Sequence, residues 1–110
     1  AANRPLFAAT LLGLGHDGHT ASLFPGNPAL AERKRWAVGV HDPSVPEPRV
    51  TLTIPTLESS GEVAFLVTGA EKSSIVARLA RDEALPAARI HPAGRLRWFL
   101  DRAALCPGAT

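Results

Sequence analysis

Residues 6–20 read LFAATLLGLGHDGHT, an apolar run that stops at a glycine and continues as a glycine-rich polar loop. The run 6–12 is short and closes on that glycine, which favours a buried strand over a helix. An apolar run without alternation is typical of a parallel sheet that is covered on both faces. We therefore predict a buried strand at residues 6–12, with the loop 13–20 at its carboxyl end.

Four further stretches are predicted to be strands. Residues 49–54 (RVTLTI) alternate apolar and polar side chains, which is the pattern of a half-buried strand. Residues 62–68 (EVAFLVT) form a second apolar run that is followed by a glycine. Residues 36–40 and 96–100 predict shorter strands.

Helical stretches are expected between these strands. Residues 70–81 carry apolar side chains at the spacing of one helical face, so they are predicted to form an amphipathic helix. A single helical turn is expected at 20–24, which the proline at the next position must end. Short helices or turns are expected at 29–35 and 55–60, and Asp101 is expected to cap a final turn.

The order of these elements indicates the fold class. Strands that alternate with helices are typical of α/β proteins with a mostly parallel sheet, and we expect a Rossmann-like layered fold. No internal repeat or linker divides the chain, so residues 1–110 are expected to form a single domain. The chain contains no Met and opens almost directly into the apolar run, which predicts a portion of a larger domain.

The composition is that of an ordinary globular domain and excludes several classes of protein. The 12 Lys and Arg exceed the 10 Asp and Glu by only two, and the basic residues form no dense block. The small positive excess and the low aromatic content of 5% argue against nucleic-acid binding. No apolar run approaches the roughly 18 residues of a membrane span. The single Cys106 excludes an intrachain disulfide, so a cytoplasmic location is expected.

Two readings of the polar loop 13–20 are disfavoured. Its glycines match the G-x-G-x-x-G pattern of dinucleotide sites, but that pattern should open a long helix, and Asp17 would repel a diphosphate. His16 and His19 could ligate a metal, but a third strong ligand at a recognised spacing is missing. We therefore expect neither a dinucleotide nor a metal.

Acid–base chemistry fits the loop better. His19 is the side chain type best suited to take a proton near neutral pH, and Asp17 could orient its ring. Gly18 would let the backbone approach a ligand, and Thr20 offers a hydroxyl and an N–H at the expected helix start. The alternative is that His19 and Asp17 are ordinary turn residues.

Two cations that lie further along the chain suit a phosphate. Arg49 begins the predicted strand 49–54, and Lys72 follows the predicted strand 62–68. Arginine can bind a phosphate with two hydrogen bonds, while lysine acts as a point charge. The alternative is that both are solvated surface charges.

Residues 11–26 (LLGLGHDGHTASLFPG) closely resemble the signature of the 6-phosphogluconolactonases. The resemblance covers essentially the whole chain, and four more pieces match in order: residues 49–53 (RVTLT), 65–72 (FLVTGAEK), 85–88 (LPAA) and 98–101 (WFLD). Glucosamine-6-phosphate deaminases share the fold and the G-x-G-x-D-G-H core, but continue with Ile-Ala-Phe-Asn-Glu-Pro. This chain reads TASLFP at residues 20–25 instead, which favours the lactonases.

The resemblance implies hydrolysis of 6-phospho-D-glucono-1,5-lactone to 6-phospho-D-gluconate, in the oxidative pentose phosphate pathway, without a metal or organic cofactor. By position, His19 would be the general base that activates water, and Asp17 would orient it. Arg49 and Lys72 would hold the anionic substrate, mainly its phosphate. The other residues expected to bind substrate are Gly15, Gly18 and Thr20.

Complete members of this family are considerably longer than the chain. The resemblance therefore implies that residues 1–110 are a partial α/β domain, the C-terminal half, without the phosphate loop of the N-terminal half. We expect the chain alone to be weakly active or inactive, and N-terminal sequence in the same or another chain could complete the site. The expected partner is a small phosphosugar lactone. A deaminase-like enzyme and a non-catalytic phosphosugar-binding fragment are the alternatives.

Overall fold

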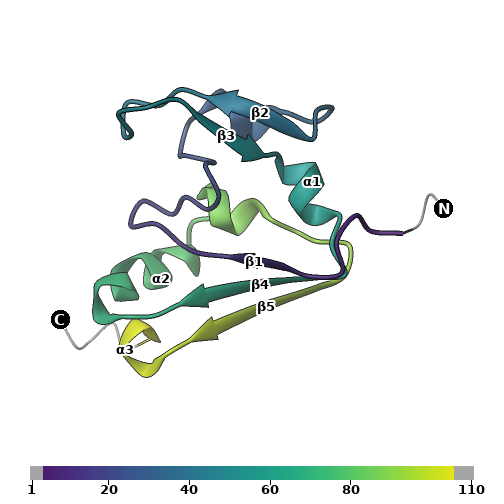
Figure 1. Cartoon of the computed structure of the whole chain (residues 1–110). Helices are drawn as coiled ribbons and strands as arrows, with labels where there is room; N and C mark the ends of the chain where they lie inside the picture. Colours follow the sequence, from purple (N-terminus) through teal and green to yellow (C-terminus); the bar gives the residue numbers. More distant parts are fainter. Residues whose placement is uncertain (1–3, 106–110) are drawn as a thin grey trace.

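A computed structural model describes residues 4–105 (Figure 1), so the expectation about Cys106 lies outside the described residues. A three-stranded parallel sheet has the order β1-β4-β5, and a separate antiparallel hairpin pairs β2 with β3. The strands are β1 (Thr10–Leu12), β2 (Ala37–Val40), β3 (Arg49–Leu52), β4 (Glu62–Val67) and β5 (Arg95–Leu100). The α-helices are α1 (Ile54–Glu58), α2 (Ser73–Leu79) and α3 (Arg102–Leu105), and the 3₁₀ helices are η1 (Pro28–Ala31), η2 (Ala70–Lys72) and η3 (Pro86–Arg89).

β4 is the central strand and the best buried one. Its Val63, Phe65 and Val67 point into the core, where α2 contributes the buried Ile75. Phe65 pairs in register with Trp98 of β5, and the two rings stack with their centroids 4.0 Å apart. The strands predicted at 62–68 and 96–100 are therefore confirmed.

β1 is shorter and more exposed than the sequence predicts. Only Thr10–Leu12 pair as a strand, and upstream a single bridge joins Phe7 to Ser60. Leu11 is 67% exposed, because within the described residues β1 pairs with β4 alone and only one of its faces meets the core. The expectation that 6–12 form a strand buried on both faces is wrong for this chain.

The hairpin lies above the sheet in Figure 1 and continues into α1. The strands predicted at 36–40 and 49–54 are confirmed as β2 and β3, although β3 ends before Ile54, which begins α1. Because the hairpin is separate, the parallel arrangement holds only for the three-stranded sheet. The α/β class nevertheless holds, since the chain combines helices with a parallel three-stranded sheet.

The helical predictions are confirmed in part. The helix expected at 70–81 is present as η2 and α2, and Asp101 caps α3 by accepting from the N–H of Ala104 at 2.9 Å. The segment expected at 29–35 is the short η1, whose cap is Asn27. Within residues 4–105, no helix combines the length and apolar character that a membrane crossing needs.

The helical turn expected at 20–24 is wrong. The backbone makes a tight turn instead, with a bridge between Thr20 and Leu23 and a φ of 52° at Ala21. The Thr20 hydroxyl donates to the carbonyl of Gly13 at 2.8 Å, which ties the turn to the end of β1. Thr20 therefore offers no helix N-terminus to a ligand.

Candidate active site

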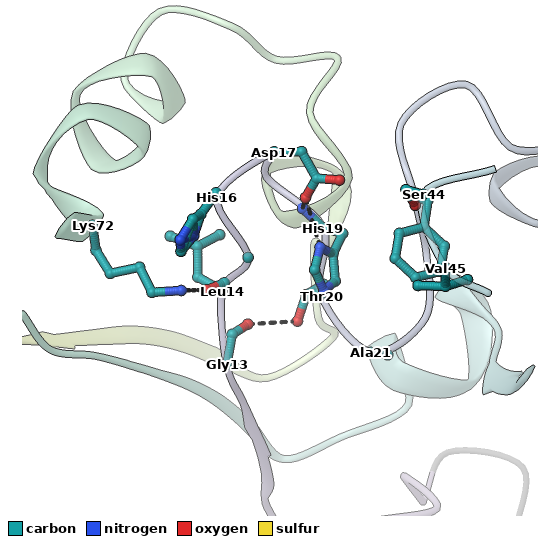
Figure 2. Close-up of a pocket in the computed structure, with 12 residues that line it drawn as sticks. Gly13, Leu14, His16, Asp17, His19, Thr20, Ala21, Ser44, Val45 and Lys72 are labelled. Atoms are coloured by element: carbon teal, nitrogen blue, oxygen red, sulfur yellow. Dashed lines mark hydrogen bonds and ion pairs between the residues drawn. The ribbon is translucent and has the colours of Figure 1, made fainter. Parts of the chain in front are cut away.

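A cleft of about 660 Å³ opens beyond the carboxyl end of β1 (Figure 2). One side is the loop of residues 13–20, hereafter the His19 loop. The other side is the loop of residues 41–48, hereafter the Ser44 loop, which contributes Ser44 and Val45. Lys72 of η2 completes the lining. The cleft thus lies where α/β proteins place their ligands, at the carboxyl edge of the sheet.

Backbone hydrogen bonds fix the His19 loop. The Gly15 N–H donates to the carbonyl of His19 at 2.8 Å, and the Gly18 N–H donates to the carbonyl of Gly15 at 3.0 Å. The Gly18 carbonyl accepts from the N–H of Ala87 in η3, also at 3.0 Å. The loop is therefore closed on itself and anchored to a distant segment.

Asp17 and His19 form a tight pair. The imidazole Nδ1 lies 2.6 Å from an Asp17 carboxylate oxygen, which also accepts from the His19 backbone N–H at 3.0 Å. Partial burial raises the pKa of Asp17, but the hydrogen bonds from the His19 ring and backbone outweigh it and leave this pKa below its ordinary value. An ionised carboxylate only accepts, so in the neutral ring Nδ1 carries the proton and Nε2 keeps a free lone pair.

The His19 ring lies between Phe24 and Gly15. It packs against Phe24 with the ring centroids 4.8 Å apart, and its side chain is 33% exposed. On its other side lies Gly15, where a Cβ atom would overlap the ring atoms Cε1 and Nδ1. Gly15 lines the cleft, and its lack of a side chain leaves the space that the imidazole occupies.

Gly18 and Thr20 have mainly structural contacts. Gly18 has a φ of 89°, a conformation that suits glycine, and a Cβ there would lie 2.9 Å from Leu85. It is buried and does not line the cleft. Thr20 lines the cleft but is buried, and its hydroxyl proton is used on Gly13.

Of the two predicted cations, the structure brings only Lys72 to the cleft. Its Nζ donates to the carbonyl of Leu14 at 2.5 Å, across 58 positions of sequence. Arg49 does not line the cleft. It begins β3, where it pairs with Val40, and β3 belongs to the hairpin instead of the parallel sheet.

Ser44 and Val45 are cleft residues that no sequence pattern predicted. Both line the cleft from a proline-rich loop that carries no chemical motif, and only the fold brings them opposite the His19 loop. His16 also lines the cleft and is exposed. Across residues 4–105, no group of three or more His, Cys, Asp or Glu side chains is placed to hold a metal ion.

Comparisons with known proteins identify the family. The family model described as glucosamine-6-phosphate isomerases/6-phosphogluconolactonase matches residues 1–98. The 6-phosphogluconolactonase of Rattus norvegicus is 47% identical over 104 residues, covering 91% of this chain and 40% of the rat protein. The human 6-phosphogluconolactonase is 45% identical over 105 residues, covering 91% of this chain and 41% of the human protein. The chain thus spans about two fifths of the length of these relatives.

Solved structures show the same relationship. The crystal structure of a devB protein is 40% identical with a TM-score of 0.82, covering 92% of this chain and 44% of that one. The 6-phosphogluconolactonase of Trypanosoma brucei is 34% identical with a TM-score of 0.74, covering 94% and 42%. A monomeric glucosamine-6-phosphate deaminase is more distant, at 26% identity and a TM-score of 0.69, covering 91% and 47%. The chain therefore belongs to the family of glucosamine-6-phosphate isomerases and 6-phosphogluconolactonases.

Proposed function

We propose that this chain carries the catalytic histidine of a 6-phosphogluconolactonase, which hydrolyses 6-phospho-D-glucono-1,5-lactone to 6-phospho-D-gluconate. The observation that carries the proposal is the Asp17–His19 pair, which opens onto the same cleft as Lys72. Curated relatives at 39–47% identity are named as lactonases, and TASLFP at residues 20–25 differs from the deaminase pattern. Both support the lactonase over the deaminase.

His19 acts as the general base in this proposal. Its Nε2 takes a proton from a water molecule while the water oxygen bonds to C1 of the lactone. The bond between C1 and the ring oxygen then breaks, and the ring oxygen receives the proton, which gives the free acid and a hydroxyl. Asp17 holds the ring in the tautomer that this step needs. General-base catalysis of this kind contributes about 10²–10⁴ in rate.

Lys72 holds the substrate phosphate. An ammonium group has three N–H donors, and the Leu14 carbonyl uses one, so two remain for phosphate oxygens. Arg49 does not line the cleft, so the proposal assigns the phosphate to Lys72 and leaves the contribution of Arg49 as an untested prediction. Gly15 and Thr20 line the cleft, and Gly18 anchors the His19 loop through its hydrogen bond with Ala87.

We also propose that residues 1–110 form one partial α/β domain. The chain spans about 40% of its relatives, which supports a site completed by an N-terminal half in the same or another chain. The chain alone should then be weakly active. A cytoplasmic location also stays a prediction, since two rice relatives are named chloroplastic.

The test compares lactone opening at neutral pH by this chain and by an extended protein, in which the N-terminal portion of the rat relative precedes it. The extended protein should be active, and His19→Ala should lower its rate about 10²–10⁴-fold. A rate that survives without His19 refutes the base assignment. Ammonia release from glucosamine 6-phosphate would instead favour the deaminase.

A second experiment tests the phosphate contact. Lys72→Ala should weaken hydrolysis of the phosphorylated lactone far more than that of glucono-1,5-lactone, because only the first carries the group that Lys72 binds. Equal losses on the two substrates would contradict the assignment.

A further inference from the structure

We propose that Ser44 accepts a hydrogen bond from a sugar hydroxyl. Together with Lys72, which lies on the other side of His19, it sets the orientation of a phosphosugar in the cleft. The inference rests on the proposed function, because it takes the ligand to be a phosphosugar. It adds a binding residue and an orientation to that function.

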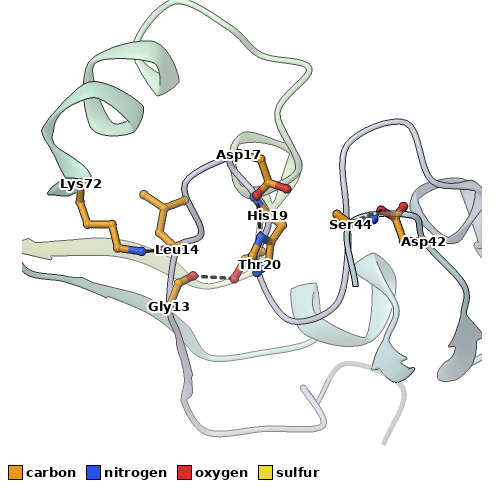
Figure 3. A network of polar contacts seen from close by, with 8 residues as sticks. All are labelled: Gly13, Leu14, Asp17, His19, Thr20, Asp42, Ser44 and Lys72. Carbon is orange, nitrogen blue, oxygen red and sulfur yellow. Dashed lines mark hydrogen bonds and ion pairs between the residues drawn. The ribbon is translucent and has the colours of Figure 1, made fainter. Parts of the chain in front are cut away.

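The starting point is the arrangement around His19. In Figure 3, Lys72 lies on one side of His19, while Ser44 and Asp42 lie on the other. Lys72 and Ser44 both line the cleft. A ligand that spans the cleft therefore meets a cation at one end and a hydroxyl backed by a carboxylate at the other.

Side-chain hydrogen bonds hold Ser44 in place. One oxygen of Asp42 accepts from the Ser44 hydroxyl at 2.6 Å and from the Ser44 backbone N–H at 3.1 Å. The other oxygen accepts from the side-chain amide of Asn27 at 2.9 Å. The same amide donates to the carbonyl of His41, also at 2.9 Å. Asn27 thus secures both Asp42 and the start of the Ser44 loop.

Asn27 also connects the Ser44 loop to the seat of His19. It is buried, and its backbone N–H donates to the carbonyl of Phe24 at 3.1 Å. Phe24 in turn packs against the His19 ring. Asn27 and Asp42 are therefore positioning residues that set Ser44 relative to the imidazole.

The hydrogen bond to Asp42 decides what Ser44 can bind. The hydroxyl proton is used on the carboxylate, so the oxygen keeps only its lone pairs for a ligand. It can accept from a sugar hydroxyl but cannot donate to a phosphate. The hydrogen bonds from Ser44 and Asn27 lower the pKa of Asp42, so its negative charge persists at neutral pH and repels a phosphate. The phosphate is therefore directed toward Lys72 and the hydroxyls toward Ser44.

A plain structural role is the alternative, since Asp42 also closes a turn by accepting from the Ser44 N–H. Calorimetry on the whole 110-residue chain with two probes, 6-phospho-D-gluconate and inorganic phosphate, separates the two. Ser44→Ala should weaken binding of 6-phosphogluconate about threefold to tenfold and leave inorganic phosphate unchanged, because inorganic phosphate binds at Lys72 and has no sugar hydroxyl to reach Ser44. Lys72→Ala should weaken both probes.

Three further variants sharpen the test. Ser44→Thr keeps the hydroxyl oxygen and should retain most of the affinity for 6-phosphogluconate. Asp42→Asn should act in the same direction as Ser44→Ala. Ser74→Ala, at an exposed serine of α2, is the matched control and should change neither affinity.

The inference is overturned if Ser44→Ala leaves 6-phosphogluconate binding unchanged, if it weakens both probes equally, or if the unaltered chain binds neither probe. Its failure can be told apart from failure of the proposed function. If Ser44→Ala weakens only 6-phosphogluconate binding but the extended protein does not hydrolyse the lactone, the inference stands and the proposed function fails. If the extended protein hydrolyses the lactone but Ser44→Ala does not distinguish the two probes, the proposed function stands and the inference fails.

Discussion

The two walls of the cleft differ in how much of their support comes from the backbone. The His19 loop is held by three backbone hydrogen bonds and by glycines that leave room for the ring and for Leu85, with the Thr20 and Lys72 side chains bonded to its carbonyls. The Ser44 loop is fixed largely by side chains, namely Asn27 and Asp42, and most of it is exposed. The comparison teaches that the group proposed for proton transfer lies on the wall whose geometry depends on the backbone. The group proposed for substrate orientation lies on the wall that substitutions can adjust.

The largest expected effect tests whether backbone space really sets the His19 wall. Gly15→Ala should lower the activity of the extended protein about 100-fold, because the added Cβ overlaps the imidazole and separates it from Asp17. The rate of lactone opening measures this. Gly39→Ala in β2, whose Cβ would meet its nearest atom only at 4.0 Å, is the matched control and should retain activity. Comparable losses in the two variants would show that the seat at Gly15 has no special role.

A smaller effect separates backbone conformation from packing in the same wall. Gly18→Ala should lower the free energy of unfolding by about 1–3 kcal/mol, since alanine is strained at a φ of 89° and its Cβ meets Leu85. Gly26→Ala has a similar φ of 73° but no atom within 4 Å of the new Cβ. Urea denaturation of both variants should therefore give a larger loss at Gly18, and equal losses would mean that the Leu85 contact costs nothing.

The smallest effect concerns acid and compares the carboxylates of the two walls. The pKa values of Asp17 and Asp42 are both lowered from 3.8 by hydrogen bonds that exist only in the folded chain. Each group therefore stabilises the fold above about pH 3.8, and this contribution is lost as the pH falls through the lowered pKa. Asp17→Asn and Asp42→Asn should each lose less stability on acidification than the unaltered chain.

Thermal unfolding from pH 6 down to about pH 2 measures this difference. If Asp17→Asn follows the same acid dependence as the unaltered chain, the pairing with His19 does not stabilise the fold. If only Asp42→Asn follows the acid dependence of the unaltered chain, the Asp42 carboxylate does not stabilise the fold. The two walls would then differ in whether their carboxylate contributes to stability.

Local pattern was enough to predict several parts of this protein. Asp17 and His19 are two positions apart in a loop that is punctuated by glycines, so their hydrogen bond needs little beyond the loop itself. The apolar run at 62–68 identified β4, because its burial follows from continuous apolar side chains. The helical spacing at 70–81 identified α2 for the same reason. In each case the residues that decide the structure are neighbours in the sequence.

Other features were decided by contacts that no local pattern contains. Leu11 is apolar, yet its exposure depends on which strands flank β1. Residues 20–24 have the composition of a helical turn, but the hydrogen bond from Thr20 to Gly13 favours a different turn. Arg49 was assigned to the phosphate by its charge and by the resemblance, and its strand β3 pairs with β2 in a separate hairpin.

The sequence by itself therefore determined the α/β class, the family and the histidine–carboxylate pair, because these depend on residue types at short separations. The tertiary structure decided which further side chains line the cleft beside that pair. Lys72 follows β4, which lies parallel to β1, and Ser44 is hydrogen-bonded to Asp42, which Asn27 binds in turn. Strand register and the packing of distant loops bring these residues together, and the spacing of residues along the chain determines neither.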